Sequence, residues 1–549
     1  MTSFAVPDQS ALAIILAFNN SAELPRKLLR KLGDKSLLAH ALELVSALSW
    51  IKRSVVASDD DEIVLVAERS GFEGILVDRG QLAGELALAA YVVDMVDPQG
   101  QSGDFLLLLS ASAPLIRPAD LDKAFSLLKR TKADSVVSAR KVKQATWNLK
   151  GGVFIADYDL EELNQPAEIE MTEGFVVCRR SNLAESLLGQ QVERLVLPRD
   201  RAVAVRDHHD WWVCEKLLSR KKVLFVVAGN QRLGMGHVYR TLSIAHELTD
   251  EDISFLCTKE SDLAVNYITS QYYPSEMQLK DDLAEEVIAR GPDLVINDIL
   301  DTEAEYIGAL KAAGLKVVNF EDQGKGAERA DLVINELFEN PDLRPQVKAG
   351  PDYFCLRDEF FQVKPRPFRE KVENVLITFG GVDPADLTRR VLRAIGPEAI
   401  RREIRVHAIT GPGYLFGPKL KELIASFGSE QIRLKEATKR ISEYMAQADL
   451  AISAAGRTVY ELAHMLVPTI VIAANRTEEK HHFGMKGVHL RLDSKASEEA
   501  IRQSFLALAD NPKRRLAMRQ AMEKMDFTSG MKRVVGEIRA VLKGQGNER

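Results

Sequence analysis

The sequence predicts an α/β protein in which parallel sheets are covered by helices on both faces. Short apolar segments of strand length alternate with amphipathic helical segments along almost the whole chain, which is typical of this fold class. Glycine-rich turns follow several of the expected strands, and such turns hold phosphates in many α/β folds. The chain has 549 residues, so domains of roughly 100–200 residues predict about three of them.

The first expected domain covers residues 1–220. Its strands are expected at residues 13–17, 51–57, 74–77, 105–109 and 135–138. The pattern then becomes irregular: a β-like stretch begins at Gly151-Gly152, and residues 207–218 have the periodicity of a helix. The polar and basic run Ser219-Arg-Lys-Lys222 precedes a new strand, so we expect a domain boundary there.

Two further domains are expected at residues 221–365 and 366–549. The strands of the first are expected at residues 223–227, 253–257, 294–296, 316–319 and 332–334. Those of the second are expected at residues 374–379, 404–409, 432–434, 450–453 and 469–472, with a closing helix at 531–542. A linker rich in proline and charge separates the two series at residues 362–370. Two consecutive α/β lobes joined by a short linker predict a ligand in the cleft between them.

Composition excludes several classes of protein. Hydrophobic residues make up 46% of the chain, charged residues 28%, and the net charge is -6, which argues against nonspecific nucleic-acid binding. No secretion signal is visible at the N-terminus, and the apolar runs are too short to span a bilayer. The four cysteines are scattered without a Cys-x-x-Cys pair, which is typical of reduced cysteines. We therefore expect a cytoplasmic protein without membrane insertion or a nucleic-acid partner.

The most informative stretch is Gly229-Asn-Gln-Arg-Leu-Gly-Met-Gly-His-Val-Tyr-Arg240, a turn between an expected strand and an expected helix. Helix N-termini at such turns bind phosphates. Gly234 and Gly236 would let the backbone approach a ligand, and His237 could act as a base beside a bound diphosphate. The alternative is a tight connection that carries an ordinary polar histidine.

A second glycine turn lies in the last domain. In Phe379-Gly-Gly-Val-Asp-Pro384, the residues Gly380, Gly381 and Asp383 follow a strand and precede a helical pattern at residues 385–395. This arrangement could form a second diphosphate cradle on the facing lobe.

Further candidates follow the next strands of the last domain. Gly456 and Thr458 belong to a small-residue segment that would bring backbone close to a ligand. Glu461 lies on the following helix and could accept hydrogen bonds from ribose hydroxyls, although a solvated helix carboxylate is the alternative. Asn475 follows the strand at 469–472, at a strand's carboxyl end where α/β ligand sites cluster.

Carboxylates also follow strands of the middle domain. Asp298 comes directly after one strand, and Glu321-Asp322 follow the next. Such positions suit contacts with a sugar or with reacting groups. Each carboxylate could equally cap a helix, and for Asp322 the two interpretations have equal weight.

Residues 222 to about 540 resemble the UDP-sugar hydrolases of the pseudaminic acid pathway, which remove UDP from UDP-2,4-diacetamido-2,4,6-trideoxy-β-L-altropyranose. These enzymes are grouped with spore-coat polysaccharide proteins of glycosyltransferase-B-like fold. The matching pieces are Gly234-Met-Gly-His-Val-Tyr-Arg240, Asp298, Glu321-Asp322, Leu356-Arg-Asp-Glu-Phe360, Phe379-Gly-Gly-Val-Asp-Pro384, Ala455-Gly-Arg-Thr-Val-Tyr-Glu461 and Asn475. Their order and spacing extend over the whole second half of the chain.

The resemblance implies a mechanism and a set of binding residues. His237 would activate water for attack at the anomeric carbon, with inversion, and backbone N–H groups of the glycine turns would stabilise the departing UDP. Glu461 would hold the ribose, and neither a metal nor another cofactor would be needed. The implied substrate-binding residues are Gly234, Gly236, Arg240, Asp298, Asp322, Gly380, Gly381, Asp383, Gly456, Thr458, Glu461 and Asn475.

Three positions depart from that family. The first loop has Gly229-Asn-Gln-Arg232 where an acidic residue is usual, Arg457 replaces a serine, and Arg476 replaces a common glutamine. Both arginines would add positive charge near the diphosphate or the sugar. With these replacements, the sequence determines neither the identity of the substrate sugar nor the choice between hydrolase and transferase.

Residues 11 to about 218 resemble the CMP-sugar synthetases that activate sialic, pseudaminic and related acids. The resemblance lies in Ala17-Phe-Asn-Asn-Ser-Ala-Glu-Leu-Pro-Arg-Lys27, Leu32-Gly-Asp-Lys-Ser-Leu37, Ala57-Ser-Asp-Asp-Asp-Glu-Ile63, Ser110-Ala-Ser-Ala-Pro-Leu115 and His209-Asp-Trp211. It implies a nucleotidyltransferase-like Rossmann-type domain. Such enzymes hold a nucleoside triphosphate over the first strand-to-helix loop with basic residues and bind magnesium through carboxylates.

Most of the residues that carry this chemistry are replaced. The replacements are Phe18 for arginine, Asn19 and Asn20 for glycines, Ala22 and Glu23 for basic residues, and Ala204 and Arg206 for aspartates. Only Lys27 keeps its charge, and Glu23 would repel a triphosphate. We therefore expect a fold without the transfer chemistry, which could bind a nucleotide or form a homodimer. The run Asp59-Asp60-Asp61 is expected to cap a helix and not to bind a metal.

The sequence thus predicts a nucleotidyltransferase-like domain followed by a two-lobed glycosyltransferase-B-like unit. The main hypothesis is a UDP-sugar hydrolase with His237 as base, fused to a degenerate first domain. The alternatives are a UDP-sugar-dependent glycosyltransferase of surface polysaccharide biosynthesis, a bifunctional protein with an active CMP-sugar synthetase domain, and a non-catalytic binding protein. Intact motifs in the second half argue against the last of these.

Overall fold

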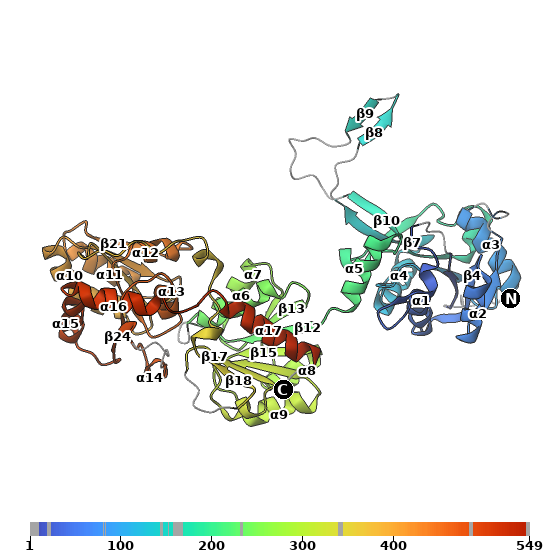
Figure 1. Ribbon diagram of the computed structural model, residues 1–549. Helices are drawn as coiled ribbons and strands as arrows, with labels where there is room; N and C mark the ends of the chain where they lie inside the picture. Colours follow the sequence, from blue (N-terminus) through green and yellow to red (C-terminus); the bar gives the residue numbers. More distant parts are fainter. Residues whose placement is uncertain are drawn as a thin grey trace. The chain divides into compact units, whose positions relative to one another are not determined.

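The structure is a computed structural model that describes residues 10–18, 23–78, 80, 82, 84–142, 147–151, 153–156, 168–230, 234–338, 344–481 and 487–544. It contains two compact units, Met1–Arg220 and Lys221–Arg549, which we call unit 1 and unit 2 (Figure 1). The sequence-based expectations at residues 19–22, 152, 231–233 and 545–549 lie outside the described residues.

Unit 1 is built on a seven-stranded sheet with the order β11-β7-β10-β6-β1-β4-β5. Its strands are β1 (Ala11–Leu16), β4 (Ile51–Ser58), β5 (Glu73–Leu76), β6 (Phe105–Ser110), β7 (Ser135–Val142), β10 (Glu168–Arg179) and β11 (Val192–Val196). Two strand pairs lie outside it, β2 (Lys31–Leu32) with β3 (Lys35–Ser36) and β8 (Trp147–Lys150) with β9 (Val153–Ala156).

The sheet of unit 1 is mixed, whereas the sequence predicts a parallel one. β10 is antiparallel to both of its neighbours, β6 and β7. Only its apolar second part, from Phe175, pairs with β6, while residues 168–171 pair with β7 alone. That first part alternates glutamate with apolar residues because it lies outside the buried centre, and such a pattern does not identify a central strand.

Helices cover the sheet of unit 1 on both faces, and each face has its own hydrophobic core. These helices are α1 (Leu37–Ser46), α2 (Asp61–Arg69), α3 (Gly84–Val96), α4 (Pro118–Thr131) and α5 (His208–Leu218). Asp60 caps α2 by accepting a hydrogen bond from the N–H of Glu62 at 2.9 Å. This contact confirms the expected helix cap in the Asp59–Asp61 run.

Unit 2 has two parallel sheets, which define its two lobes. The first lobe has the order β14-β13-β12-β15-β16-β17-β18. Its strands are β12 (Lys222–Val227), β13 (Asp252–Cys257), β14 (Ser275–Met277), β15 (Leu294–Asp298), β16 (Lys316–Phe320), β17 (Leu332–Asn335) and β18 (Val347–Ala349). Its helices are α6 (Gly236–Glu247), α7 (Asp262–Ser270), α8 (Leu283–Arg290) and α9 (Ala304–Ala312).

The second lobe has the order β21-β20-β19-β22-β23-β24. Its strands are β19 (Asn374–Thr378), β20 (Arg405–Thr410), β21 (Ile432–Glu436), β22 (Leu450–Ala454), β23 (Thr469–Ile472) and β24 (His489–Leu492). Its helices are α10 (Leu387–Arg401), α11 (Gly417–Ser426), α12 (Ile441–Gln447), α13 (Thr458–His464), α14 (Arg476–Glu479), α15 (Glu498–Ala509) and α16 (Pro512–Met522). In each lobe the first strand, β12 or β19, lies inside the sheet. The next two strands are added on one side of it, and the later strands, from β15 or β22 onward, are added on its other side.

The last helix, α17 (Gly530–Lys543), returns to the first lobe (Figure 1). Val534, Val535, Ile538 and Val541 join the hydrophobic core that contains strand β12. Lys316 at the start of β16 donates a hydrogen bond to the Leu542 carbonyl at 2.9 Å. Strand β18 ends before residue 365 and β19 begins after it, but α17 packs against the lobe that precedes this residue.

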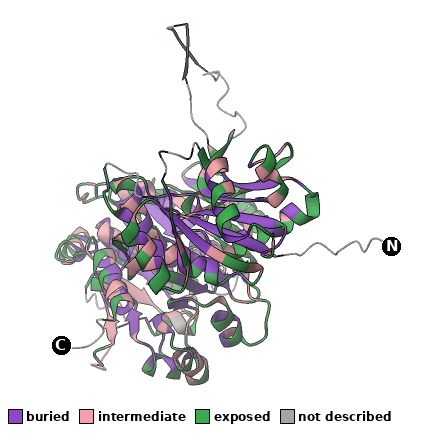
Figure 2. Ribbon diagram, turned by 90° about the vertical axis from the view of Figure 1, so that its right-hand side faces the viewer, coloured by how far each residue is buried: buried purple, intermediate pink, exposed green. Residues whose placement is uncertain are grey.

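Burial follows the layered arrangement (Figure 2). Central strands are buried along their length in both lobes of unit 2, as in β15, β19 and β22, and β12 is buried except for Lys222. The covering helices carry the exposed residues. None of the helices in the described part of the chain combines the length and the apolar character needed to cross a membrane.

Candidate active site in unit 2

The candidate site lies at the carboxyl ends of the central strands of unit 2. The strand order reverses between β12 and β15 in the first lobe and between β19 and β22 in the second. Open parallel sheets bind their ligands at such reversal points. A cavity of about 540 Å³ opens there and is lined by residues of both lobes, which is large enough for a small-molecule ligand.

The structure places almost all of the sequence-predicted site residues in the wall of this cavity. Those in the wall are Gly234, Gly236, His237, Arg240, Gly380, Gly381, Asp383, Gly456, Thr458, Glu461 and Asn475. Asp298 and Asp322 do not line it. Both are fully buried, and their side chains serve other groups of the protein.

The glycine turns of the two lobes approach each other closely. Gly234 and Gly380 have positive φ angles of 88° and 76°, which glycine adopts without strain. A Cβ on Gly381 would lie 3.2 Å from the Cβ of Met235, and a Cβ on Gly411 would lie 2.3 Å from the Gly381 carbonyl oxygen. These turns therefore present backbone to the cavity, which suits N–H donors for a diphosphate.

His237 is held by a carboxylate behind it. Its Nδ1 lies 2.5 Å from Oδ1 of Asp298, and Asp298 has no exposed surface. Burial would raise the pKa of Asp298, but Arg240 and His237 outweigh burial and hold it at about 2. An ionised Asp298 accepts a hydrogen bond from Nδ1–H, so Nε2 carries the free electron pair. The position of Asp298 thus corresponds to a residue that orients the base, and not to the expected substrate contact.

Arg240 lies at the centre of a buried charge cluster. Its guanidinium donates to Asp298 at 2.6 and 2.8 Å, to Glu321 at 2.9 Å and to Glu336 at 2.8 Å. Arg457 of the second lobe forms an ion pair with the same Glu336 and donates to the Cys355 carbonyl at 2.7 Å. Although Arg240 borders the cavity, its hydrogen bonds go to protein carboxylates.

The cluster shifts the pKa values of two of its members toward neutrality. Burial raises the pKa of Glu321 to about 7, against the attraction of Arg240. Burial and the nearby Arg240 lower the pKa of Arg457 to about 9. Such shifts are typical of functional sites, where charges are removed from water.

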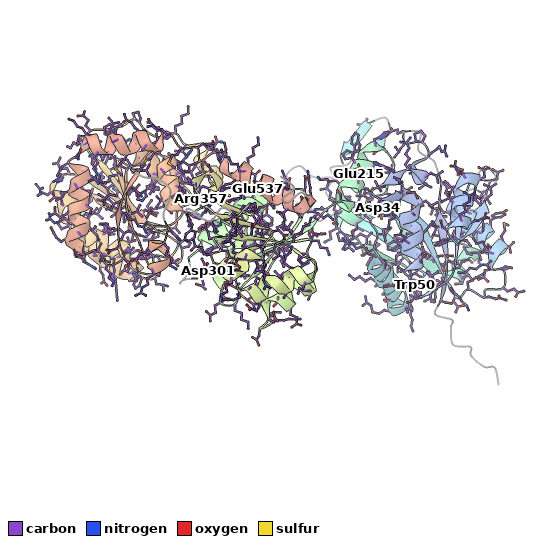
Figure 3. The ribbon with its side chains drawn as sticks, turned by 60° about the horizontal axis from the view of Figure 1, so that its bottom comes forward. Asp34, Trp50, Glu215, Asp301, Arg357 and Glu537 are labelled. Atoms are coloured by element: carbon purple, nitrogen blue, oxygen red, sulfur yellow. The ribbon has the colours of Figure 1, made fainter. Side chains whose placement is uncertain are left out.

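A second ion pair joins the lobes on another side of the cavity. Nε of Arg357 donates to Oε1 of Glu461 at 2.7 Å, and Arg357 also pairs with Glu359 at 2.9 Å. Arg357 is labelled in Figure 3, where it lies between the two lobes of unit 2. The structure therefore places Glu461 in the cavity wall as an ion-pair partner. It does not have the solvated environment that the sequence left open, since it is 5% exposed.

Two expected binding carboxylates organise the backbone. The carboxylate of Asp383 accepts hydrogen bonds at 2.8 Å from the N–H groups of Leu387 and Thr388, at the start of α10. Asp322 accepts from the N–H groups of Thr302 at 3.0 Å and Gly324 at 2.8 Å, and from the side chains of Thr302 and Asn319 at 2.6 Å. Asp322 is not the N-cap of the helical turn that follows it, since that position is held by Gly324, and its acceptors are occupied by groups inside the first lobe.

Several residues of the site were not among those that the sequence predicts. Glu336 directly follows β17, just as Asp298 ends β15. A carboxylate at the end of a parallel strand was therefore a sequence signal for Glu336 too. Gly411 follows β20 in a glycine turn that was also visible. His481 had no such signal. Its Nδ1 faces the Ala455 carbonyl at 2.7 Å, and burial lowers its pKa to about 4, so it is neutral at physiological pH.

Strained backbone gathers around the cavity. Leu300, Glu321, Asp383 and Ala437 all line it and have positive φ angles of 70°, 51°, 44° and 45°. Each lies shortly after a strand of unit 2. A non-glycine residue in this conformation costs on the order of 1–3 kcal/mol, and such strain is concentrated at functional sites.

In the described part of the corresponding region of unit 1, several side chains are engaged within the protein. Nζ of Lys27 donates to the Val205 carbonyl at 2.6 Å and is buried, and burial lowers the pKa of Lys27. Phe18 belongs to a hydrophobic core, and Asp210 accepts hydrogen bonds from Arg206 at 3.1 Å. Within the described ranges, no three His, Cys, Asp or Glu side chains converge as metal ligands.

Comparison with known proteins places both halves. Residues 12–167 match the family described as Cytidylyltransferase, and residues 374–534 match the Glycosyltransferase family 28 C-terminal domain. A Helicobacter pylori protein named pseudaminic acid cytidylyltransferase and UDP-2,4-diacetamido-2,4,6-trideoxy-beta-L-altropyranose hydrolase is 23% identical over 509 residues, which cover 87% of this chain and 91% of that protein.

Two other relatives match only part of the chain. The spore coat polysaccharide biosynthesis protein SpsG of Bacillus subtilis is 27% identical over 277 residues, 48% of this chain and 81% of that protein. An uncharacterized protein of Methanocaldococcus jannaschii is 26% identical over 277 residues. The match covers 47% of this chain and spans 57% of that relative's length.

These matches confirm the resemblance that the sequence predicts. The chain is a homologue, over most of its length, of the two-part Helicobacter pylori protein. They also confirm the fold class, an α/β chain with a cytidylyltransferase-like N-terminal domain followed by a two-lobed, glycosyltransferase-B-like part.

Proposed function

We propose that unit 2 is a UDP-sugar hydrolase that releases UDP and a free 2,4-diacetamido-type sugar in a nonulosonic acid pathway. The observation that carries this proposal is the pairing of His237 with Asp298 at 2.5 Å, at the wall of a cavity between two glycine turns. The relative named as a UDP-diacetamido-sugar hydrolase supports the choice of substrate. An acting base and two backbone cradles are what the hydrolysis of a sugar diphosphate requires.

The reaction follows from the orientation of His237. Asp298 accepts the Nδ1 hydrogen bond, so Nε2 can take a proton from water as the water oxygen bonds to the anomeric carbon. The bond between that carbon and the β-phosphate oxygen breaks at the same time, and its electron pair leaves with UDP. Attack opposite the leaving group inverts the anomeric centre.

The charge of the departing diphosphate is met by backbone donors. Gly234 and Gly236 lie at the N-terminus of α6, and Gly380 and Gly381 lie between β19 and α10. Helix N-termini and glycine turns stabilise negative charge without the need for a metal. Arg457 is already bonded to Glu336 and Cys355, so its positive charge reaches the ligand mainly through the field of the cluster.

The first experiment is UDP release from UDP-2,4-diacetamido sugars by the purified full chain without an acceptor. We expect UDP and free sugar in equal amounts. UDP release that depends on an added acceptor would instead establish a glycosyltransferase, which the family 28 match of the second lobe makes the alternative. UDP binding without release under either condition would show a binding protein.

For unit 1 we propose a retained fold without nucleotide transfer. Lys27 is engaged by the Val205 carbonyl and Phe18 is packed in the core, so neither of these two positions offers a cation to a triphosphate. We expect no pyrophosphate release when the protein is incubated with CTP, magnesium and pseudaminic acid. CMP-sugar formation would contradict this proposal and support the bifunctional alternative.

A further inference from the structure

The proposed mechanism assigns no role to Glu321, a buried carboxyl group of the cavity wall. Glu321 directly follows β16, borders the cavity and is 4% exposed. Its Oε1 accepts hydrogen bonds from Arg240 at 2.9 Å and from the N–H groups of Glu336 and Leu337 at 2.9 and 3.3 Å. Its Oε2 is buried and has no hydrogen-bond partner among the described residues.

Five other ionisable groups and one thiol belong to the buried cluster that contains Glu321. They are His237 and Arg240 of α6, Asp298 of β15, Glu336 after β17, Cys355 before the second lobe, and Arg457 before α13. The two arginines are matched by Asp298 and Glu336, with which they form ion pairs. Glu321 is thus the third carboxylate beside two guanidinium groups, and when it is ionised the cluster has one more negative than positive charge.

The excess charge has a consequence for the step at His237. If Glu321 is ionised and His237 is neutral, the cluster carries one net negative charge, and a proton on His237 brings it to zero. If Glu321 is protonated, the same proton leaves an uncompensated positive charge in a buried site, which is unfavourable. One guanidinium connects the two groups, because Arg240 donates to Glu321 through Nη1 and lies 3.5 Å from Nδ1 of His237 through Nη2.

We propose that Glu321 is a positioning residue whose ionised carboxylate stabilises the imidazolium that forms at His237 when water is activated. This inference rests on the proposed hydrolase function. Because burial raises the pKa of Glu321 to about 7, the carboxyl group ionises near neutral pH. The rate of UDP release should rise with the fraction of ionised Glu321.

The test is the pH dependence of UDP release by the full chain and its Glu321→Gln variant. Glutamine has the shape of the neutral acid but cannot ionise. Above about pH 8 we expect the variant to be about tenfold slower than wild type. Below about pH 6 we expect the two rates to be nearly equal, because Glu321 of wild type is then protonated and as uncharged as the glutamine. Glu286→Gln is the matched control, since Glu286 is a buried carboxylate of the same lobe outside the cavity.

The outcomes separate this inference from the function on which it rests. A loss of rate in Glu321→Gln that is the same at every pH, or no loss at all, would overturn the inference while wild-type release upholds the hydrolase. No release by wild type at any pH would overturn both.

A second readout needs no substrate. The infrared absorption of protonated carboxyl groups should contain a component that titrates near neutral pH in wild type and Glu286→Gln, and this component should be missing from Glu321→Gln. Its absence from wild type would overturn the inference.

Discussion

Replacing His237 with alanine is expected to lower UDP release by about 10²–10⁴-fold, the usual contribution of a positioned general base. Nε2 of His237 is the group that Asp298 orients toward the cavity, and alanine leaves no atom to take the proton of water. The backbone N–H groups of the glycine turns remain, so calorimetry should still detect UDP binding. Chromatographic measurement of UDP at saturating substrate would give the rate.

His246→Ala is the matched control for this prediction. His246 lies on the same helix, α6, but is exposed and packs beside Tyr273 at a ring distance of 5.6 Å. It is expected to release UDP at the wild-type rate. If His237→Ala also kept the wild-type rate, another group would have to act as base, and the proposed mechanism would be wrong.

The sequence predicted the positions of site residues better than their orientations. Apolar runs that end in glycine-containing turns located nearly all central strands of unit 2, because parallel strands are buried on both faces and are followed by turns. Residues after these strands then had to lie at one edge of each sheet. Whether a side chain there faces the cavity or the interior depends on tertiary contacts, so Asp298 and Asp322 were expected as substrate contacts.

Long-range pairing was the part that sequence could not supply. Arg240 bonds with Asp298, Glu321 and Glu336, which come from three different strand ends, and no local pattern couples them. The return of α17 to the first lobe is of the same kind, since its apolar periodicity predicts a buried face but not the surface that covers it. The antiparallel β10 was missed because its first part has an alternating pattern outside the core.

Replacing Arg240 with methionine is expected to lower the free energy of unfolding of unit 2 by about 3–5 kcal/mol, the usual loss when one partner of a buried ion pair is removed. Methionine retains apolar length but removes the ion pairs of Arg240 with Asp298, Glu321 and Glu336, in a site where Arg240 is 1% exposed. Against a typical total stability of about 5–15 kcal/mol, this is a large share.

The chain offers a way to assign that loss to unit 2. All four tryptophans lie in unit 1, at Trp50, Trp147, Trp211 and Trp212. In denaturant titrations, Arg240→Met should therefore shift the unfolding transition seen by far-UV circular dichroism and leave the tryptophan fluorescence transition in place. Arg502→Met, which removes an exposed ion pair with Glu499, should change neither transition. An unshifted dichroism transition in Arg240→Met would contradict the role of the cluster.

A double variant tests whether the loss comes from charge or from packing. Without Arg240, Glu336 still has Arg457 and Asp298 still has His237 as partners, whereas Glu321 loses its ion pair. Adding Glu321→Gln to Arg240→Met removes this unpaired carboxylate while it keeps the shape of the side chain. If electrostatics dominates, the double variant should be more stable than Arg240→Met alone at pH values above about 8, where Glu321 would otherwise be ionised. If packing dominates, the two changes should add, and the double variant should be the less stable of the two.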